Sequence, residues 1–590
     1  MYRYTSGCWT PVDLGIPMAT ESRTRELLAA SPLFALLPEN VLALVQEKLE
    51  PFPVESGDWL MRKGDPGDAL YIVDSGRLEV VLGEHDGIEL EDDEDVRVLR
   101  VLGRGSTVGE LALVTGDPRS ASVRATRDSD LYRLSFDDFH QLLDSSPAFG
   151  HALVKVMGRQ LQASGGFPGD VPSARTTAFI PLQDGINLDL LAMVVGRAFG
   201  DLGDIAVLDQ HTAEQGSPDS WGHTLDDLER EHDRVLLVAQ TTDTPWRRFC
   251  VRQADRLVCV TRPEMPPHDR PMPRLRGCDL VFVGPEFPVE VADAWLDRLK
   301  PRVRHRVWST PDSVNPEDVF RAARRVAGRS LGLVLGGGGA RGYAHLGVLE
   351  VLEENGIPVD RIGGTSMGGI VASLYAYGLN AEQRRHAAAA FFSPRVRHRY
   401  QVPPRSAIAR TDGAEELLDR VFGDAMIETL PIDLYTVAAD MVEAEMVVQR
   451  RGRVADAAMS TARIPAILPP GRADGKLLVD GGLIRNLPVG VMADMDEGPV
   501  VAVEVGGRFE PEVETDGNPG LPGVGETLMR SVLLGSAAAG EKVVERADLL
   551  IEPEVSGIKM LAFHEIDKAI QIGREAAEEN LDEIRALLER

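Results

Sequence analysis

The sequence predicts a multidomain protein of mixed α/β class, and three observations support this fold class. The chain has 590 residues, which is too long for one ordinary core and favours three or four domains. Between residues 65 and 125, short apolar runs alternate with turn signals, as is typical of β-structure. From Thr177, and again from Leu331, nearly continuous apolar strands alternate with helical patterns, which indicates parallel α/β layers.

Composition and charge narrow the classes of function. Apolar residues make up 43% of the chain and charged residues 26%, as in soluble globular proteins. The net charge of −29 repels nucleic acid and anionic lipid, so we expect no nucleic-acid partner, and membrane contact only through a local basic patch. No apolar run reaches the roughly 18 residues that a membrane span needs. The N-terminus also lacks the apolar core of a secretory signal.

Cysteine usage points to a reducing compartment. The four cysteines are too few for a disulfide framework and form no C-x₂-C pair, which predicts a cytoplasmic protein without a metal site. Peripheral contact with the inner face of a membrane stays open. The sequence does not set the oligomeric state.

The N-terminal part is expected to hold an arm and one domain. Residues 1–29 show no clear period and predict a loose arm, followed by a domain over residues 30–162. In this domain, Val41–Leu49 has helical spacing, and the acidic run Glu89–Asp95 reads as a solvated hairpin tip. Two further helices are predicted, over Phe136–Leu143 and Gly150–Leu161.

Two α/β domains are expected to follow. Residues 163–175 are a linker by composition, and residues 176–329 are predicted to form a middle α/β domain. The middle domain contains no G-x-x-x-x-G-K-[ST] motif, so nothing marks it as a nucleotide hydrolase. The last domain is predicted over residues 330–590, interrupted by the Pro/Gly-rich loop Pro511–Gly523.

The segment "LGLVLGGGGARGYAHLGVLE" opens the last domain, and three interpretations compete for its glycines. A phosphate loop of the Walker type needs Lys-Ser/Thr after the last glycine, but Gly342 is followed by Tyr-Ala. A dinucleotide turn fits better, since Gly337, Gly339 and Gly342 spell G-x-G-x-x-G and Asp360 lies 18 residues further on. Alternatively, the bare amides stabilise an oxygen that becomes negative only during a reaction.

The segment "GGTSMGG" favours the third interpretation. It contains G-x-S-x-G with Ser366 at its centre, and it precedes a helical run. Flanking glycines permit a sharp strand-to-helix turn that holds the serine hydroxyl in a strained, exposed position. The predicted oxyanion donors are the amides of Gly337, Gly338 and Gly339, with Arg341 either fixing this loop or forming a surface charge.

A serine nucleophile also needs a base, and Asp480 in "LLVDGGLIRNLPV" is the first candidate because it ends an apolar strand. The rival is a triad in the order Ser366, Asp480, His564. His564 lies in a pattern typical of a helical surface, and His345 is expected to be structural. His386 and His398 fall in an Arg-rich segment without an orienting acid.

The blocks "GGGGARG", "GTSMG" and "DGG", in this order, resemble those of patatin-like phospholipases. The resemblance implies an α/β hydrolase domain with a Ser-Asp dyad that uses no histidine and needs no metal. It makes Ser366 the nucleophile and Asp480 the base. It assigns the oxyanion hole to Gly337, Gly338 and Gly339 with Arg341.

The segment "GELALVTGDPRSASVRA" indicates a second, separate site. Glu110 can accept from a ribose hydroxyl, and nine residues later Arg119 can meet a phosphate. With "GDPGDALYIVDSG" upstream, it resembles a cyclic-nucleotide-binding domain, which implies a β-roll and cAMP or cGMP as a possible effector. The alternative is a cassette fold that has lost its ligand. The matching residues are Gly109, Glu110, Leu111, Ala112, Arg119 and Ser120.

The whole arrangement resembles neuropathy target esterase-type lysophospholipases, and Thr244–Val260 and Val555–Asp567 strengthen the match. The resemblance implies a serine esterase that hydrolyses acyl esters of lysophospholipids or phospholipids. The animal enzymes carry several nucleotide cassettes and a membrane anchor, whereas this chain shows one cassette and no anchor. The rival function is a nucleotide-responsive binding or scaffold protein with an inactive hydrolase domain. The basic segment Phe391–Arg410 reads either as a membrane-docking patch or as an internal salt-bridged loop.

Overall fold

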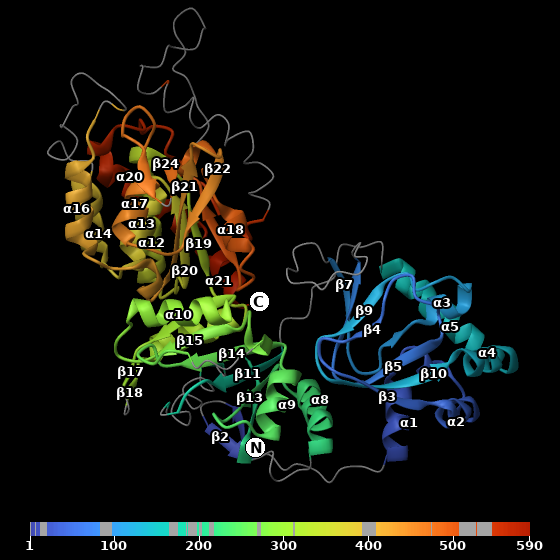
Figure 1. Ribbon diagram of the computed structural model, residues 1–590. Coiled ribbons are helices and arrows are strands. Elements are labelled where there is room, and N and C mark those ends of the chain that lie inside the picture. Colours follow the sequence, from blue (N-terminus) through green and yellow to red (C-terminus); the bar gives the residue numbers. More distant parts are fainter. Residues whose placement is uncertain are drawn as a thin grey trace, which may run out of the picture. The chain divides into compact units, whose positions relative to one another are not determined.

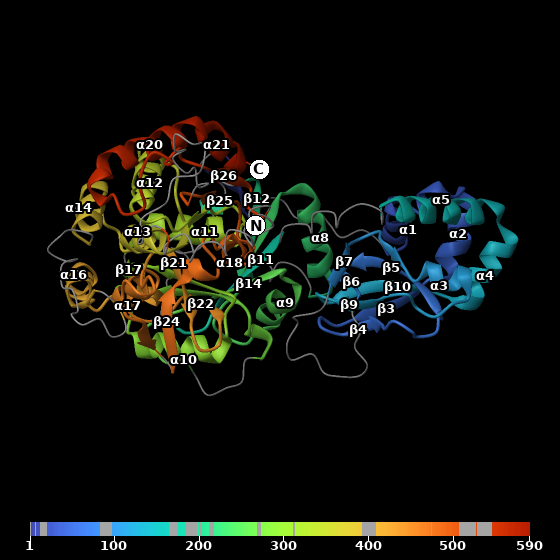
Figure 2. The ribbon, with the colours of Figure 1, turned by 90° about the horizontal axis from the view of Figure 1, so that it is seen from above.

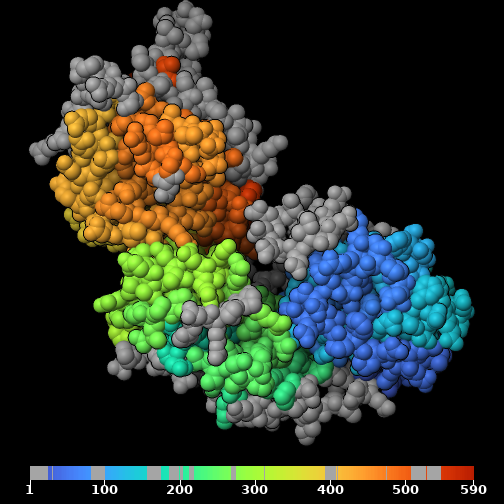
Figure 3. All heavy atoms as spheres, viewed as in Figure 1, coloured from blue at the N-terminus to red at the C-terminus, as the bar shows by residue number. Residues whose placement is uncertain are grey.

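The computed structural model divides into two compact units (Figure 1). The N-terminal unit comprises Met1–Val283 and Ala294–Arg304, and the C-terminal unit comprises Gly284–Asp293 and His305–Arg590. Figure 3 shows the described side chains as coloured spheres. Apart from a few isolated residues, the structure describes residues 2–5, 8–11, 20–82, 97–163, 175–184, 203–211, 218–267, 273–310, 313–391, 409–473, 475–506 and 546–589.

The first domain of the N-terminal unit is a β-roll of two four-stranded antiparallel sheets. Strand β5 (Ala69–Ser75) is buried along its whole length, so it forms the centre of the core. The remaining strands of its sheet are β3 (Glu50–Val54), β10 (Ser129–Ser135) and β8 (Thr107–Val108). The second sheet consists of β4 (Trp59–Met61), β9 (Ser122–Ala125), β6 (Leu78–Leu82) and β7 (Arg97–Leu102).

Helices gather at one end of the β-roll (Figures 1 and 2), where Phe34, Phe139 and Phe149 form the apolar contact. The three helices predicted from periodicity are confirmed, with bounds that differ by a few residues. The helices are α1 (Thr20–Ala30), α2 (Glu39–Lys48), α4 (Phe136–Ser145) and α5 (Pro147–Ala163). The predicted hairpin tip Glu89–Asp95 and most of the linker 163–175 lie outside the described residues.

The middle domain is built on a largely parallel sheet in the order β16-β15-β14-β11-β13-β12-β1-β2. Its central strands are short and largely buried, as expected for a sheet covered on both faces. The parallel strands are β11 (Thr176–Pro181), β12 (Ile205–Asp209), β13 (Arg234–Val238), β14 (Arg256–Thr261) and β15 (Asp279–Val283), followed by β16 (Val303–Val307). The helices include α8 (Trp221–Glu231), α9 (Pro245–Gln253) and α10 (Val289–Leu299).

The N-terminal residues differ from the expected loose arm. Strands β1 (Tyr2–Thr5) and β2 (Cys8–Pro11) form a hairpin that continues the middle sheet, because β1 pairs antiparallel with β12. Helix α1 also begins inside the predicted arm, at Thr20. Four-residue strands are too short to show a period in the sequence, and what places them is the open edge of β12, whose unpaired backbone groups accept another strand.

Within the N-terminal unit, a buried charge cluster joins the β-roll to the middle domain. Arg127, in the turn between β9 and β10, pairs with Glu229 of α8 at 2.7 Å and with Asp255 after α9, whose Oδ1 lies 2.9 Å from its Nε. Arg77 contacts the same Asp255 carboxylate at 2.5 Å. Burial alone would raise the pKa of Asp255, but Arg127 and Arg77 hold it below the usual value.

The C-terminal unit has a mixed sheet in the order β23-β24-β21-β20-β19-β25-β26, with β22 also paired to β21. Its parallel part is β19 (Gly332–Leu335), β20 (Arg361–Thr365), β21 (Asp433–Asp440), β25 (Val500–Val503) and β26 (Leu549–Ile551). The antiparallel edge is β22 (Glu445–Gln449), β23 (Gly471–Ala473) and β24 (Lys476–Asp480).

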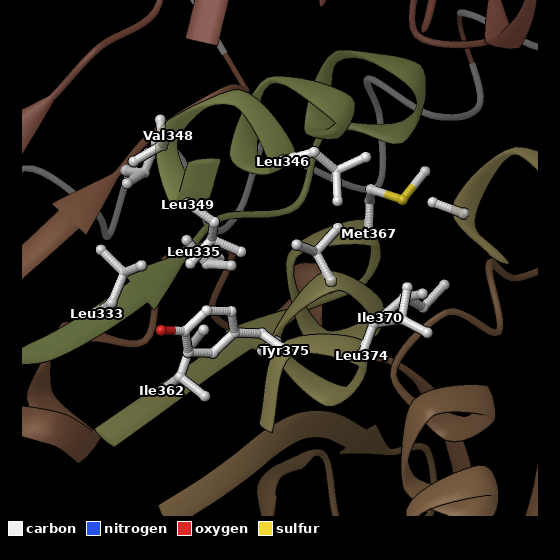
Figure 4. Packing of buried hydrophobic residues seen from close by; sticks show 14 of the residues in the cluster. Leu333, Leu335, Leu346, Val348, Leu349, Ile362, Met367, Ile370, Leu374 and Tyr375 are labelled. Carbon is white, nitrogen blue, oxygen red and sulfur yellow. The ribbon is translucent and has the colours of Figure 1, made fainter. Parts of the chain in front are cut away.

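Alternate side chains of β19 enter two different cores, so both faces of this sheet are covered. Leu333 and Leu335 join one apolar cluster and Val334 joins the other. Figure 4 shows Leu335 against Leu346 and Leu349 of the helix that follows the glycine turn. The helices of this unit include α11 (Pro316–Val326), α12 (Ala344–Glu354), α13 (Met367–Ala376), α14 (Ala381–Phe391), α16 (Asp412–Phe422), α17 (Val454–Ser460), α18 (Val489–Ala493), α20 (Ile566–Glu579) and α21 (Leu581–Glu589).

The described residues contain neither a helix suited to crossing a membrane nor a cluster of metal-binding side chains. None of their helices combines the length and apolar character that a membrane crossing requires. In the same part of the chain, no three His, Cys, Asp or Glu side chains cluster in a way that could hold a metal ion.

Candidate active site

Ser366 occupies the turn between β20 and α13 with φ 55° and ψ −124°, a left-handed conformation that non-glycine residues rarely adopt. The flanking glycines are required by close backbone contacts. A Cβ on Gly364 or Gly368 would lie 2.5 Å or 2.2 Å from the carbonyl oxygen of Leu335. The strand-to-helix turn expected from G-x-S-x-G is therefore present, with the serine strained at its apex.

Strand β21 brings Ser366 and Asp480 together. Thr365, the residue before Ser366, lies opposite Val437 of β21, and Asp480 lies opposite Ala438. Since Val437 and Ala438 are consecutive, the ends of β20 and β24 meet across one strand. The Ser366 hydroxyl donates a hydrogen bond to Asp480 Oδ2 at 2.6 Å.

The Asp480 carboxylate is buried, and burial raises its pKa to about 6. Two hydrogen bonds oppose this effect: the Ser366 hydroxyl donates to Oδ2, and the amide of Gly482 donates to Oδ1 at 2.8 Å. At neutral pH the carboxylate is therefore mostly ionised, and its basicity is higher than that of a solvated aspartate.

Thr461 supports the backbone of Ser366 and was not predicted from the sequence. Its Oγ1 accepts a hydrogen bond from the amide of Ser366 at 2.9 Å and donates one to the carbonyl of Val437 at 2.5 Å. This bridge fixes the strained turn to β21. Thr461 lies in no motif, so nothing in the sequence marks it.

The three predicted oxyanion donors are not equivalent. The amide of Gly337 donates to the carbonyl of Asn486 at 3.3 Å. Among the described residues, none accepts a hydrogen bond from the amides of Gly338 and Gly339. Gly339 has φ 59°, and a Cβ there would lie 2.3 Å from the carbonyl oxygen of Met560, so only glycine fits. Two amides thus remain available at the start of the 3₁₀ turn Gly339–Tyr343.

Arg341 is buried beneath this turn, so the interpretation as a surface charge is wrong. Its Nε donates to the carbonyl of Ile558 and its Nη1 to that of Gly506, both at 2.7 Å. A longer contact of 3.4 Å joins Nη2 to the carbonyl of Ser556. The guanidinium therefore fixes the loop by binding backbone carbonyls, which is the first of the two roles expected from the sequence.

The histidines lie apart from the dyad. His345 is fully buried, its Nε2 lies 2.8 Å from the carbonyl of Gly336, and burial lowers its pKa to about 4. It is therefore neutral at pH 7, with Nε2–H donating to that carbonyl. His564 and His386 are exposed, and His398 lies outside the described residues.

The β-roll brings Glu110 and Arg119 to one place at the start of helix α3 (Glu110–Thr115). Arg119 is buried, and its guanidinium donates to the carbonyls of Gly109 and Ala69 at 2.9 and 2.8 Å and to Asp68 Oδ1 at 2.9 Å. Two buried polar atoms, Glu110 Oε2 and Arg119 Nε, have no partner among the described residues. Ala112 is buried beside them, while Leu111 and Ser120 are exposed.

Asp68 was missed, although it lies in the segment "GDPGDALYIVDSG" that indicated a cassette. It holds the guanidinium of Arg119 across a sequence separation of 51 residues. Unpartnered polar atoms on both Glu110 and Arg119 fit a ligand with hydroxyl and phosphate groups.

Comparison with known proteins finds family models for two parts of the chain. A family model described as patatin-like phospholipase matches residues 333–493, and one described as cyclic nucleotide-binding domain matches residues 51–146. Among solved structures, the regulatory domain of Toxoplasma gondii PKA with cAMP is similar at 35% identity over 21% of this chain and 44% of that chain, with a TM-score of 0.18.

Relatives extend the likeness over most of the chain. A lysophospholipase NTE1 from Coccidioides immitis is 26% identical over 95% of the chain, and the mouse patatin-like phospholipase domain-containing protein 6 is 27% identical over 85%. The chain spans 42% of the length of each of these two proteins. An uncharacterized NTE family protein of Mycobacterium tuberculosis is 32% identical over 95% of this chain and 96% of its own length. The chain thus belongs to the NTE family, with a cyclic nucleotide-binding domain ahead of a patatin-like phospholipase domain.

Proposed function

We propose that the protein is a serine esterase that hydrolyses acyl esters of lysophospholipids or phospholipids through Ser366 and Asp480. The observation that carries this proposal is the 2.6 Å hydrogen bond between the strained Ser366 hydroxyl and the buried Asp480 carboxylate. The family model and the names of the longer relatives, which include lysophospholipases, support the lipid substrate class.

The reaction needs only these groups and water. Asp480 accepts the proton of Ser366 as the serine oxygen attacks the ester carbonyl, and the amides of Gly338 and Gly339 stabilise the resulting oxyanion. The intermediate collapses, the alcohol leaves with the proton from Asp480, and an acyl-serine remains. Water then attacks this ester while Asp480 accepts its proton, and Asp480 returns that proton to the serine oxygen as the fatty acid is released.

Labelling and hydrolysis together test this proposal. A fluorophosphonate should label the wild-type protein stoichiometrically at Ser366 but should not label S366A. A panel of lysophospholipid and phospholipid esters should show fatty-acid release that phosphonate abolishes. If the wild-type protein is labelled nowhere and releases no fatty acid, the rival function, a scaffold with an inactive hydrolase domain, replaces the esterase.

The β-roll supports a second activity, the binding of cAMP or cGMP at Glu110 and Arg119. The observation that favours it is the pair of buried, unpartnered atoms on these two side chains. Calorimetry with each nucleotide tests it, with R119A as the control. Absence of binding to the wild-type protein would reduce the β-roll to a structural module.

Regulation of the esterase by nucleotide requires more than binding. The nucleotide must bind two conformations of the chain unequally, and the coupling must be reciprocal. A phosphonate fixed on Ser366 should therefore change nucleotide affinity, typically about 5- to 150-fold in coupled systems, and a reversible inhibitor at Ser366 should show the reciprocal change. Identical nucleotide affinity with and without the phosphonate would contradict coupling.

Peripheral membrane docking through the basic segment Phe391–Arg410 stays a prediction, because most of this segment lies outside the described residues. Each basic residue near an anionic surface can contribute about 1 kcal/mol. Binding to vesicles should strengthen with anionic lipid and weaken with salt. Binding that depends on neither would favour the internal loop.

A further inference from the structure

We infer that Asn486 and Glu504 are positioning residues that hold the glycine turn in register with Ser366 for acyl transfer. The inference rests on the proposed esterase function, because it concerns the same site. Asn486 follows the "DGG" block, and Glu504 follows strand β25.

Asn486 binds Gly337 through two hydrogen bonds. Its side-chain Nδ2 donates to the carbonyl of Gly337 at 2.9 Å, and its backbone carbonyl accepts from the amide of Gly337 at 3.3 Å. Gly337 also lies against the nucleophile, since a Cβ built on it would be 2.6 Å from Asn486 Oδ1 and 3.1 Å from Ser366 Cβ. Asn486 therefore fixes the position of Gly337, which lies between Asn486 and Ser366.

The orientation of the Asn486 amide is fixed by its surroundings. Nδ2 faces two acceptors, the carbonyl of Gly337 and, at 3.4 Å, Oε1 of Glu504. Rotating the amide would place its oxygen against both of them. In the observed orientation Oδ1 is buried without a partner among the described residues.

Glu504 extends the same support to the other side of the turn. Its Oε1 accepts from the amide of Gly506 at 2.6 Å, and a Cβ on Gly336 would lie 3.4 Å from that oxygen. The carbonyl of Gly506 in turn accepts from Arg341. The contacts therefore form a continuous path from Asn486 through Glu504 and Gly506 to Arg341, which encloses the glycine turn.

This path sets the position of the oxyanion donors. Gly338 and Gly339 directly follow Gly337, so a shift of Gly337 moves both free amides relative to Ser366. Stabilisation of the oxyanion depends steeply on such distances, whereas a lipid acyl chain held elsewhere does not sense them. Loss of the contacts of Asn486 or Glu504 should consequently lower kcat much more than it raises KM.

The test compares variants per labelled active site. N486A removes the donor to Gly337. The isosteric N486D replaces Nδ2 with an oxygen that faces the Gly337 carbonyl and Glu504 Oε1 and cannot donate to them. Both should lower kcat about 10- to 100-fold, with KM changed less than about threefold. E504A should behave in the same way, while E504Q keeps the Oε1 acceptor and should retain most of the activity. The control is N355A, which removes a hydrogen bond to Val351 at the end of α12.

Titration with a fluorophosphonate separates positioning from folding. A merely structural role would lower the labelled fraction and the melting temperature, as N355A should, but would leave kcat per labelled serine at the wild-type value. That result for both N486A and E504A would overturn the inference. Failure of the proposed function looks different, because the wild-type protein itself would then neither label nor hydrolyse esters.

Discussion

Ser366 combines two unfavourable features that serve one purpose. Its backbone conformation costs a non-glycine residue about 1–3 kcal/mol, and its hydroxyl is bonded to a carboxylate removed from water. Thr461 and the flanking glycines compensate by fixing the turn on β21. The strain places the serine oxygen at the start of α13, beside the glycine turn rather than inside the helix.

Replacing either member of the dyad should abolish turnover. S366A removes the nucleophile and D480N removes the base, so each should lower kcat by about 10³-fold or more in an ester hydrolysis assay. H564A should have little effect because this side chain is exposed. H345A should lower stability more than kcat per labelled site. A folded histidine variant as inactive as S366A would replace the dyad with a triad.

The raised pKa of Asp480 predicts opposite pH responses of activity and stability. Because the base must be ionised, kcat/KM should rise through a pKa of about 6 and then level off. Stability responds in the opposite direction. Burial favours the protonated acid in the folded protein, so the contribution of Asp480 to the free energy of unfolding falls as pH rises from about 4 to 6. At pH 8, D480N should therefore be more stable than the wild type by about 1–3 kcal/mol, measured by urea unfolding. An unchanged or lower unfolding free energy would contradict the burial argument.

At the residue scale, the motifs predicted side chains that the structure brings together, Ser366 and Asp480, but not the residues that hold them. Ser366, Asp480 and the glycines lie in short motifs whose composition is itself a physical requirement. Thr461 and Asn486 act through hydrogen bonds to residues 95 and 149 positions away. Such contacts leave no local signature, so only the fold reveals them.

At the element scale, helix α9 is bonded to the carboxyl ends of two strands of the middle domain. Thr244 caps its N-terminus, accepting from the amide of Arg247 at 3.1 Å. Arg247 then donates to the carbonyl of Pro181 at the end of β11, and the indole of Trp246 donates to that of Val238 at the end of β13. Parallel sheets of this kind commonly bind ligands at these carboxyl ends. Here α9 uses the carbonyls for internal bonds instead.

Gln183 occupies the point where the strand order reverses, between β11 and β14. Its Oε1 accepts from the hydroxyl of Thr261 and the amide of Arg262, both at 3.0 Å, and its Nε2 donates to the carbonyl of Met265 at 3.0 Å. Q183L should leave these groups buried without partners and lower the unfolding free energy by about 1–3 kcal/mol. Urea unfolding measures the loss, and the matched variant is Q183E, which keeps the Oε1 acceptor but loses the Nε2 donor to Met265. Wild-type stability in Q183L would show that Gln183 is not a structural bridge.

The strands and helices with strong periodicity were predictable from sequence, and the shortest elements were not. The α/β alternation in both later domains follows from buried, nearly continuous apolar strands such as Val235–Val238. Strands β1 and β2 depend on an edge more than 190 residues away, since Tyr2 lies opposite Val207. A local pattern cannot contain that information.

At the scale of the whole molecule, the charge cluster around Arg127 makes the β-roll and the middle domain parts of one unit. R127M should leave Glu229 and Asp255 buried without their main partner, which typically costs about 3–5 kcal/mol. Differential scanning calorimetry should show the transition of the N-terminal unit at lower temperature, while phosphonate labelling of Ser366 persists. R124M, which breaks a pair with Glu79 inside the β-roll, is the matched control. An unchanged transition in R127M would show that the cluster does not hold the two domains.

The same junction should respond to pH through Asp226 of α8. Burial raises its pKa to about 8, with the carboxylate of Glu229 adding to the effect and Arg104 and Arg127 opposing it. The folded protein therefore favours the protonated acid, and the unfolding free energy of this unit should fall as pH rises from about 4 to 8. D226N should flatten that dependence, measured by urea unfolding at several pH values. An equal slope in wild type and D226N would contradict it.

The alignment of β24 with β21 has a consequence for how preparations of this protein behave. Successive residues of a strand point to opposite faces, so a slip of one position would turn Asp480 away from Ser366 and present Val479 or Gly481 instead. There is no intermediate arrangement, because a strand cannot be half a residue out of step. A molecule with this slip is therefore silent rather than slow, because no carboxylate lies beside its Ser366. Counting serines by covalent labelling measures how faithfully this pair of strands was assembled, and partial misfolding would change the number of active molecules without changing their rate.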